Sequence, residues 1–196
     1  VINDEIAAAL DRLSRAGVRP AAFACDTVFS SDGIFDPAPG YLADAYAAIR
    51  RAGGLCIADE VQAGLGRVGE RLWGFAADDV VPDIVTLGKP IGNGHPVAAV
   101  ITTAAIAEEF SRTGYYFSTF AGNPVSAAVG MTVLEIMERE HLPRQAEVIG
   151  CYLRGALGEL AARSNVIGDV RGPGLFIGAE VVNPDGSPAP AAAERI

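Results

Sequence analysis

The residue that stands out first for its chemistry is Lys89, the only lysine in a chain whose other basic residues are all arginines. A neutral lysine amine can condense with an aldehyde to form an imine, whereas an arginine side chain does not lose its proton in proteins. Lys89 follows an apolar run, residues 84–87, that is typical of a buried strand, and burial would lower the pKa of its amine. The sequence therefore favours a catalytic lysine over one left by chance on a solvated surface.

An acid, Asp59, stands in the same position at the end of the preceding predicted strand, residues 55–58. In open α/β sheets ligands collect outside the carboxyl ends of the strands, so the two side chains are expected in one site. An acid beside a pyridine nitrogen keeps that nitrogen protonated and lets the ring accept electrons. Together with an imine-forming amine it suits a pyridoxal phosphate site. Position alone leaves an equal alternative for Asp59, a cap or turn residue at the strand end.

Motifs for other cofactors are absent from the sequence. A phosphate-binding P-loop would need a glycine and a hydroxyl residue where the chain has Asp83 and Pro90, and no dinucleotide-type glycine turn opens a helix. His95 and His141 have no partners at metal-ligand spacing, so no metal site is predicted. The run STFAGN at residues 118–123 precedes a predicted helix. It could bind a phosphate through hydroxyl and N–H groups, or simply cap the helix.

The composition is that of a globular protein, and it leaves a small polar ligand open. A hydrophobic content of 50% in 196 residues is enough for one sizeable core or parts of two. A net charge of -9 argues against nucleic acid or an anionic membrane as the main partner. The three cysteines form no disulfide or zinc pattern and are expected to be core residues in a reducing compartment. Without an apolar run of membrane length or a signal-peptide pattern, a cytoplasmic enzyme is expected.

Strand and helix patterns alternate along the chain, which predicts an α/β fold with a mostly parallel sheet flanked by helices. Strands are expected at residues 21–25, 55–58, 84–87 and 97–102, with a helix at residues 41–52 that ends in a left-handed turn at Gly53 and Gly54. The turn at residues 90–96 is too short for a helical crossover. The strand at residues 97–102 is therefore expected antiparallel to its predecessor or beside it.

A second, smaller unit is predicted towards the C-terminus. Asn123 is expected to cap a helix that runs to about Arg139, and a further helix is expected at residues 142–163. Strands at residues 165–171 and 175–182 flank a Gly-Pro-Gly turn. We therefore assign residues 1–140 to part of a cofactor-binding large domain, and residues 141–196 to a linker helix and part of a small α/β C-terminal domain.

Three runs of the sequence resemble successive motifs of the class III aminotransferases, pyridoxal phosphate enzymes of the ornithine aminotransferase type. The runs are IADEVQAGLGR at residues 57–67, PDIVTLGK at residues 82–89, and STF followed by GNP within residues 118–124. The resemblance covers about residues 21–182 and is clearest between residues 54 and 138. It implies that family's large domain in incomplete form, and the chain is expected to be a fragment because it starts without methionine and stops in a helix-prone stretch.

The resemblance also implies a role for each matching side chain. Lys89 would hold pyridoxal 5'-phosphate as a Schiff base and, once released by substrate, move a proton between the substrate Cα and the cofactor. Asp59 would pair with the pyridinium nitrogen, and Gln62 would lie near the phenolic oxygen. Val61 would pack on the ring, although an ordinary core valine is the alternative. Thr119 would reach the cofactor phosphate of the other subunit, because sites of this family lie at a homodimer interface.

The activity expected from the resemblance is transfer of an amino group between an amine or amino acid and a keto acid. One departure favours an alternative. Ordinary members carry Gly-Leu-Gly-Gly-Gly after the lysine, whereas PIGNGHP at residues 90–96 is similar to the branch that contains ethanolamine-phosphate and phosphohydroxylysine phospho-lyases. Both reactions use the same Schiff base and proton abstraction, so Lys89 does not distinguish them.

The substrate is not readable from the sequence, and Arg67 is expected either at the site entrance or on the surface. The family's main phosphate-binding turn and ring-stacking aromatic residue match nothing in the chain. A non-catalytic fragment is therefore a third alternative, and the chain alone is expected to bind cofactor poorly.

Overall fold

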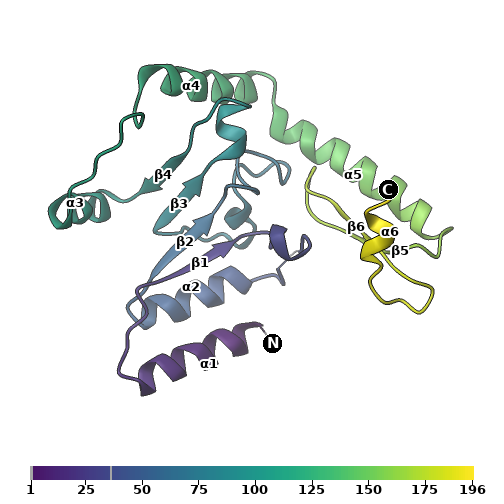
Figure 1. The fold of residues 1–196 in the computed structure, drawn as a ribbon, viewed down its shortest axis with the longest axis horizontal. Helices are drawn as coiled ribbons and strands as arrows, with labels where there is room; N and C mark the ends of the chain where they lie inside the picture. Colours follow the sequence, from purple (N-terminus) through teal and green to yellow (C-terminus); the bar gives the residue numbers. More distant parts are fainter. Residues whose placement is uncertain (1, 36) are drawn as a thin grey trace.

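The computed structural model describes residues 2–35 and 37–196, which contain a larger sheet with helices beside it and a smaller sheet next to α5 (Leu142–Ala161) (Figure 1). In the described residues, the larger sheet has four strands in the order β1 (Ala22–Asp26), β2 (Leu55–Asp59), β3 (Ile84–Leu87) and β4 (Ala99–Thr102). Strands β1 to β3 are parallel, and β4 runs antiparallel to β3. The predicted mostly parallel sheet is confirmed, as is the reversal of direction after the short turn at residues 90–96.

The helices are α1 (Ile2–Arg15), α2 (Tyr41–Arg51), α3 (Ala104–Thr113), α4 (Pro124–Arg139), α5 (Leu142–Ala161) and α6 (Pro190–Ala193). Short 3-10 helices, η1 (Ser30–Asp32), η2 (Gly74–Asp78) and η3 (Lys89–Gly92), lie in the loops. The sequence patterns did not predict α3. The sequence feature that marks the start of α3 is its N-cap residue, Thr103. The Thr103 hydroxyl accepts a hydrogen bond from the N–H of Ile106 at 3.4 Å.

Helix α2 packs on one face of the larger sheet and forms the main core with it. Its residues Leu42, Ala45 and Tyr46 are each 1% exposed, and they pack in one cluster with Cys56 and Ala58 of β2, which are 0% exposed. The apolar positions of α2 recur at helical spacing, whereas those of β2 alternate, so each element presents one apolar side. The helix ends at Arg51, and the left-handed turn predicted after it lies at Gly53, which has a φ of 86°. Glycine takes this left-handed conformation at little cost.

A two-stranded antiparallel sheet of β5 (Ile167–Arg171) and β6 (Gly178–Val181) lies beside α5 (Figure 1). The predicted helices at α4 and α5 and both predicted strands are confirmed, with ends that differ by up to three residues. The division into a large and a small domain at residue 140 stays a prediction.

Arg171 ties the small sheet to the loop after β1. Its Nε donates to the carbonyl of Ile34 at 2.9 Å, and its Nη2 donates to that of Gly33 at 3.0 Å. Its guanidinium also lies 4.5 Å from the centre of the Phe35 ring and pairs with the carboxylates of Asp169 and Glu180. One side chain therefore joins segments far apart in the sequence.

The prediction that the cysteines are core residues is right for Cys25 and Cys56 and wrong for Cys151. Burial raises the pKa of the Cys25 thiol to about 12, with a further contribution from the Asp26 carboxylate. Cys151 lies on an exposed face of α5, where its thiol donates to Glu147 Oε1 at 3.3 Å. Among the described residues, no helix combines the length and apolar character that crossing a membrane requires.

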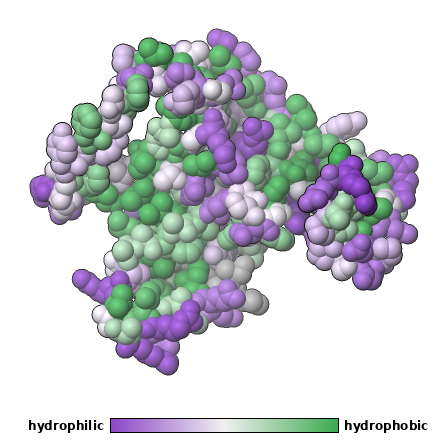
Figure 2. All heavy atoms as spheres, in the orientation of Figure 1, coloured by the Kyte–Doolittle hydropathy of each residue, from purple (hydrophilic) through white to green (hydrophobic). Residues whose placement is uncertain are grey.

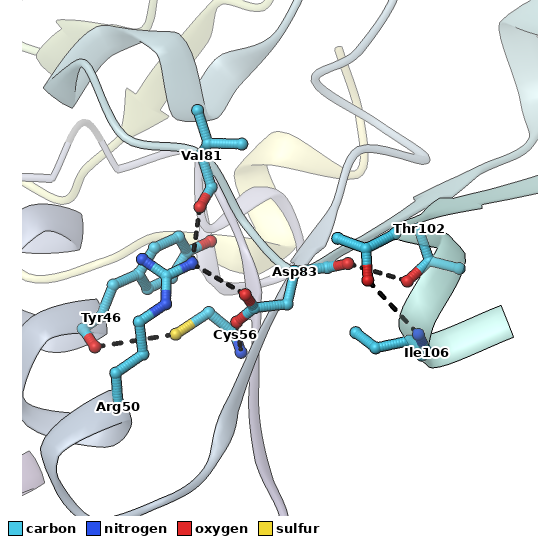
Figure 3. Close-up of polar contacts among 8 residues, drawn as sticks. Tyr46, Arg50, Cys56, Val81, Asp83, Thr102 and Ile106 are labelled. Atoms are coloured by element: carbon cyan, nitrogen blue, oxygen red, sulfur yellow. Dashed lines mark hydrogen bonds and ion pairs between the residues drawn. The ribbon is translucent and has the colours of Figure 1, made fainter. Parts of the chain in front are cut away.

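Asp83, at the entrance to β3, connects α2, β2 and β4 (Figure 3). Its Oδ2 accepts the N–H of Cys56 at 2.7 Å, and its own N–H donates to the Cys56 carbonyl at 2.8 Å. Its Oδ1 pairs with Arg50 Nη2 at 3.1 Å, and its carbonyl accepts the hydroxyl of Thr102 at 2.9 Å. The carboxylate therefore fixes the register of β3 beside β2.

We expect Asp83→Ala to lower the free energy of unfolding by about 1–3 kcal/mol, because the N–H of the fully buried Cys56 loses its acceptor. Arg50→Ala is the matched control. The Arg50 side chain is 43% exposed, so solvent screens the pair, and a loss below about 1 kcal/mol is expected. Urea unfolding followed by circular dichroism measures the free energy of unfolding of both variants. Equal losses in the two variants would contradict the claim that Asp83 stabilises the chain mainly through the N–H of Cys56.

Candidate active site

Lys89 lines a hollow of about 520 Å³ at the carboxyl end of β3, and the structure brings Val61, Gln62 and Arg67 into the same wall. The other lining residues come from the loop after β1, the turn after Lys89 and the approach to β6: Ile34, Pro90, Asn93, Gly94, Leu175, Phe176 and Ile177. A hollow of this size is in the range of small-molecule and cofactor sites. Arg67, for which the sequence left two alternatives, is exposed and faces this hollow.

The prediction that the Lys89 side chain is buried is wrong, because the residue is exposed. The strand ends at Leu87, and η3 begins at Lys89 itself, so the side chain enters the hollow rather than the space between strands and helices. The Lys89 backbone has a φ of 29°, a left-handed conformation that side chains rarely adopt. The sheet thus delivers the amine to an open surface through a constrained turn.

Asp59 lies at the same end of the neighbouring strand, opposite Thr86 in the parallel pairing of β2 with β3. Its Oδ1 accepts the hydroxyl of Thr86 and the N–H of Val61, each at 3.1 Å. Its Oδ2 has no hydrogen bond within the described part of the chain, so it is open to a donor. Asp59 is exposed and does not line the hollow of Lys89. The bond to Val61 shows that it also closes the turn at the strand end, which was the alternative prediction.

Val61 and Gln62 begin the turn that follows β2, and both are half-buried. The turn is anchored beneath by a second cluster in which buried Ala63 and Val68 pack with Val28 and with Phe176. Val61 lines the hollow, so it is not an ordinary core valine. The wall of the hollow therefore rests on a small apolar core of its own.

Glu60 is a structural determinant of the site that the motif reasoning missed. It is 0% exposed, and its carboxylate accepts three hydrogen bonds: from Thr27 Oγ1 at 3.0 Å, from the N–H of Gly74 at 2.9 Å and from the N–H of Phe75 at 3.0 Å. Burial raises the pKa of Glu60, and the three donors only partly offset that effect. The signal was present in the sequence, since strand alternation puts residue 60 on the core side with Cys56 and Ala58.

Gly74 is required by this arrangement. A Cβ at that position would lie 2.2 Å from Thr27 Oγ1, which is too close for any real contact. The backbone of η2 can therefore approach Glu60 closely enough to donate to it only because residue 74 has no side chain.

Thr119 lies apart from the hollow, in an exposed segment between α3 and α4. Nearby, Ser118 Oγ accepts the N–H of Ala121 at 3.2 Å, which closes a turn before α4 rather than capping the helix. Asn123 caps α4 as predicted, with its Oδ1 accepting the N–H of Ser126 at 2.9 Å. The suggested contact of Thr119 with a cofactor in another subunit stays a prediction.

The residues present fit a pyridoxal phosphate site in their chemistry. A primary amine and an amide side chain share one hollow, and a carboxylate oxygen open to a donor lies at the end of the adjacent strand. A mainly parallel sheet with these groups at its carboxyl edge has the arrangement of the pyridoxal phosphate-dependent transferases.

Solved structures share this fold over nearly the whole chain. A phospholyase from Arthrobacter in complex with phosphoethanolamine matches with a TM-score of 0.92 and 44% identity, over 96% of this chain and 45% of that one. The ornithine aminotransferase from Toxoplasma gondii, whose structure reveals partial occupancy of pyridoxal phosphate at its active site, matches with a TM-score of 0.82 and 35% identity. That match covers 90% of this chain and 41% of the other.

The chain belongs to the class-III aminotransferase family, whose model it matches over residues 2–194. It is 50% identical to an alanine–glyoxylate aminotransferase 2-like protein of Drosophila melanogaster over 83% of this chain and 33% of the relative. It is 48% identical to an alanine–glyoxylate aminotransferase 2 homolog of Arabidopsis thaliana over 90% of this chain and 36% of that relative. The chain thus spans about a third of the length of these relatives. The family implies pyridoxal phosphate as cofactor.

The raised pKa of Glu60 makes the free energy of unfolding depend on pH, and the variant Glu60→Gln isolates this contribution. Because the folded-state pKa is raised above its ordinary value of 4.5, the folded chain holds this proton more tightly than the unfolded chain. The contribution of Glu60 to the free energy of unfolding is therefore largest below pH 4.5 and falls as the pH rises through the raised folded pKa.

We expect the stability difference, wild type minus Glu60→Gln, to shrink as the pH rises from about 4, because glutamine does not titrate. At about pH 4 the Glu60→Gln chain is expected to be less stable than wild type. The NH2 group of the glutamine would face an N–H of η2, from which the Glu60 oxygen accepts a hydrogen bond. Urea unfolding at each pH measures both chains. A difference that grows with pH would mean that the Glu60 pKa is lowered rather than raised.

Proposed function

We propose that this chain is part of a pyridoxal phosphate-dependent transaminase that transfers an amino group between an amine or amino acid and a keto acid. The observation that carries the proposal is the single lysine amine in the hollow at the end of β3, beside the strand that ends in Asp59. Membership of the class-III aminotransferase family supports it.

In the proposed site each side chain has a distinct task. The bound cofactor would accept the electron pair left when the substrate Cα loses its proton. Asp59 would hold a proton at the ring nitrogen through Oδ2, which makes no hydrogen bond among the described residues. Gln62 would orient the phenolic oxygen, and Val61 would cover the ring face. Lys89 would take the proton from Cα and return it, and its exposed side chain leaves room for that movement.

We propose that the protein is a homodimer in which the segment carrying Thr119 reaches the partner's site. This segment exposes large apolar side chains: Tyr115 is 91% exposed, Phe117 72% and Phe120 80%. Figure 2 shows further hydrophobic surface over the strands of the larger sheet. Contiguous exposed apolar surface is typical of protein–protein contacts, and a second copy would cover it.

A phospho-lyase acting on a phosphorylated amine is the second candidate. It is favoured by the PIGNGHP turn after Lys89 and by the 44% identity to the Arthrobacter phospholyase bound to phosphoethanolamine. The same proton abstraction by Lys89 would serve both reactions, which differ in whether phosphate leaves from the carbon next to Cα. The substrate, rather than the lysine, decides between them.

Labelling tests whether Lys89 carries the cofactor. Incubation with pyridoxal phosphate and reduction with borohydride traps even a weakly held Schiff base, and Lys89 and the N-terminal amine are the primary amines available. We expect the mass of one reduced cofactor on the peptide that contains Lys89, and its loss in Lys89→Ala. Arg67→Gln, which removes a cation from the same wall, is the control that should keep the label. Label on the N-terminal peptide alone would refute the assignment.

A pair of assays separates the two candidate reactions. With an amino donor such as alanine and an acceptor such as glyoxylate, we expect amine transfer above the rate of the Lys89→Ala chain. With phosphoethanolamine we expect no Lys89-dependent release of inorganic phosphate. Phosphate release that exceeds amine transfer would replace the transaminase by the phospho-lyase.

A further inference from the structure

The turn that carries Lys89 needs an anchor because its backbone is strained. Lys89 has a φ of 29° and Asn93 a φ of 43°, so two residues other than glycine are held in left-handed conformations. Such residues persist only where the surroundings fix them. Within the turn, the N–H of Asn93 donates to the carbonyl of Pro90 at 3.1 Å, and the N–H of His95 donates to that of Gly92 at 2.9 Å. These bonds shape the turn but do not attach it to the rest of the molecule.

His95 supplies an attachment. Its Nε2 lies 2.8 Å from Ser126 Oγ in the first turn of α4. Among the described residues, this is the one side-chain hydrogen bond that joins residues 89–96 to another helix or strand. His95 is half-buried and lies outside the hollow of Lys89, so it would act on the site only through the turn.

From Ser126 the hydrogen bonds continue towards Thr119. Asn123 Nδ2 donates to Ser126 Oγ at 2.9 Å and to the carbonyl of Phe120 at 2.8 Å. Phe120 directly follows Thr119 in the chain. One hydrogen-bonded path therefore runs from the turn of Lys89 to the exposed segment at the start of α4.

The contact can persist whether or not the imidazole is protonated. Ser126 Oγ already accepts from Asn123, and its hydroxyl can donate to Nε2 of a neutral ring that carries its proton on Nδ1. A ring with a proton on Nε2 donates to Ser126 Oγ, which has a second acceptor site. The pair is thus a fixed link rather than a pH switch.

We propose that the His95–Ser126 contact is a positioning bridge that holds the strained Lys89 turn against the N-terminus of α4. The lysine amine and the Thr119 segment then keep one relative placement. The part of this inference that concerns the lysine rests on the proposed function, in which Lys89 holds the cofactor. The mechanical part does not.

Hydrogen exchange in the cofactor-free chain tests the mechanical part. His95→Ala and Ser126→Ala should each speed exchange of the N–H groups of Asn93 and His95 or its replacement by roughly fivefold or more, and the double variant should add little. Amides of β1 and β2 should be unchanged. His95→Gln, whose amide can reach Ser126 Oγ, should restore slow exchange. Unchanged exchange in His95→Ala, or independent addition of the two effects, would overturn the bridge.

Borohydride trapping at Lys89 tests the consequence for the site. His95→Ala should lower the initial rate of trapping by roughly threefold or more at a fixed pyridoxal phosphate concentration, with His95→Gln close to wild type. Faster exchange with a trapping rate equal to wild type would overturn the link to the lysine while leaving the proposed function in place. Failure of the wild-type chain to trap cofactor at Lys89, with faster exchange in His95→Ala, would instead overturn the proposed function and leave the bridge supported.

Discussion

The buried carboxylate of Glu60 is the interaction on which the site depends. A fully buried carboxylate is costly unless donors surround it, and here Thr27 at the end of β1 and two backbone N–H groups of η2 supply them. These donors come from two separate stretches of chain, which meet Glu60 only in the folded state. Because Asp59 and Val61 are its immediate neighbours, fixing Glu60 also fixes the backbone at the end of β2. Removing one of the donors would leave the buried carboxylate less well compensated.

The two reactive groups are held in different ways. Asp59 is fixed by the sheet itself, since its partner Thr86 is its cross-strand neighbour. Lys89 leaves the sheet at once and depends on a strained turn that is braced against α4. The acid is thus placed by regular structure and the amine by an irregular one. This division would suit the proposed roles, in which Asp59 stays still and Lys89 moves a proton.

Much of the fold follows from the sequence because regular elements obey short-range rules. The apolar spacing of α2, the Asn-Pro start of α4 and the short turn before β4 each predict what the structure contains. The order of Asp59 and Lys89 at successive strand ends was also readable. The exposure of Lys89, the outward position of Cys151 and the His95–Ser126 contact were not. Each depends on where a loop or a helix face lies relative to distant parts of the chain, which local patterns do not encode. Glu60 is predictable in part. The alternation of side chains along β2 predicts that Glu60 is buried, but it does not predict which groups donate hydrogen bonds to its carboxylate.

The link made by Arg171 has a consequence for the order in which the molecule assembles. The guanidinium closes a loop between residues 138 positions apart, and one of its acceptors, Ile34, belongs to the wall around Lys89. During synthesis the strands of the larger sheet leave the ribosome long before Arg171 does. A nascent chain can therefore pair β1 with β2 and β3 while that wall remains unsupported. The surroundings of Lys89 are therefore completed only after residue 171 has been synthesised.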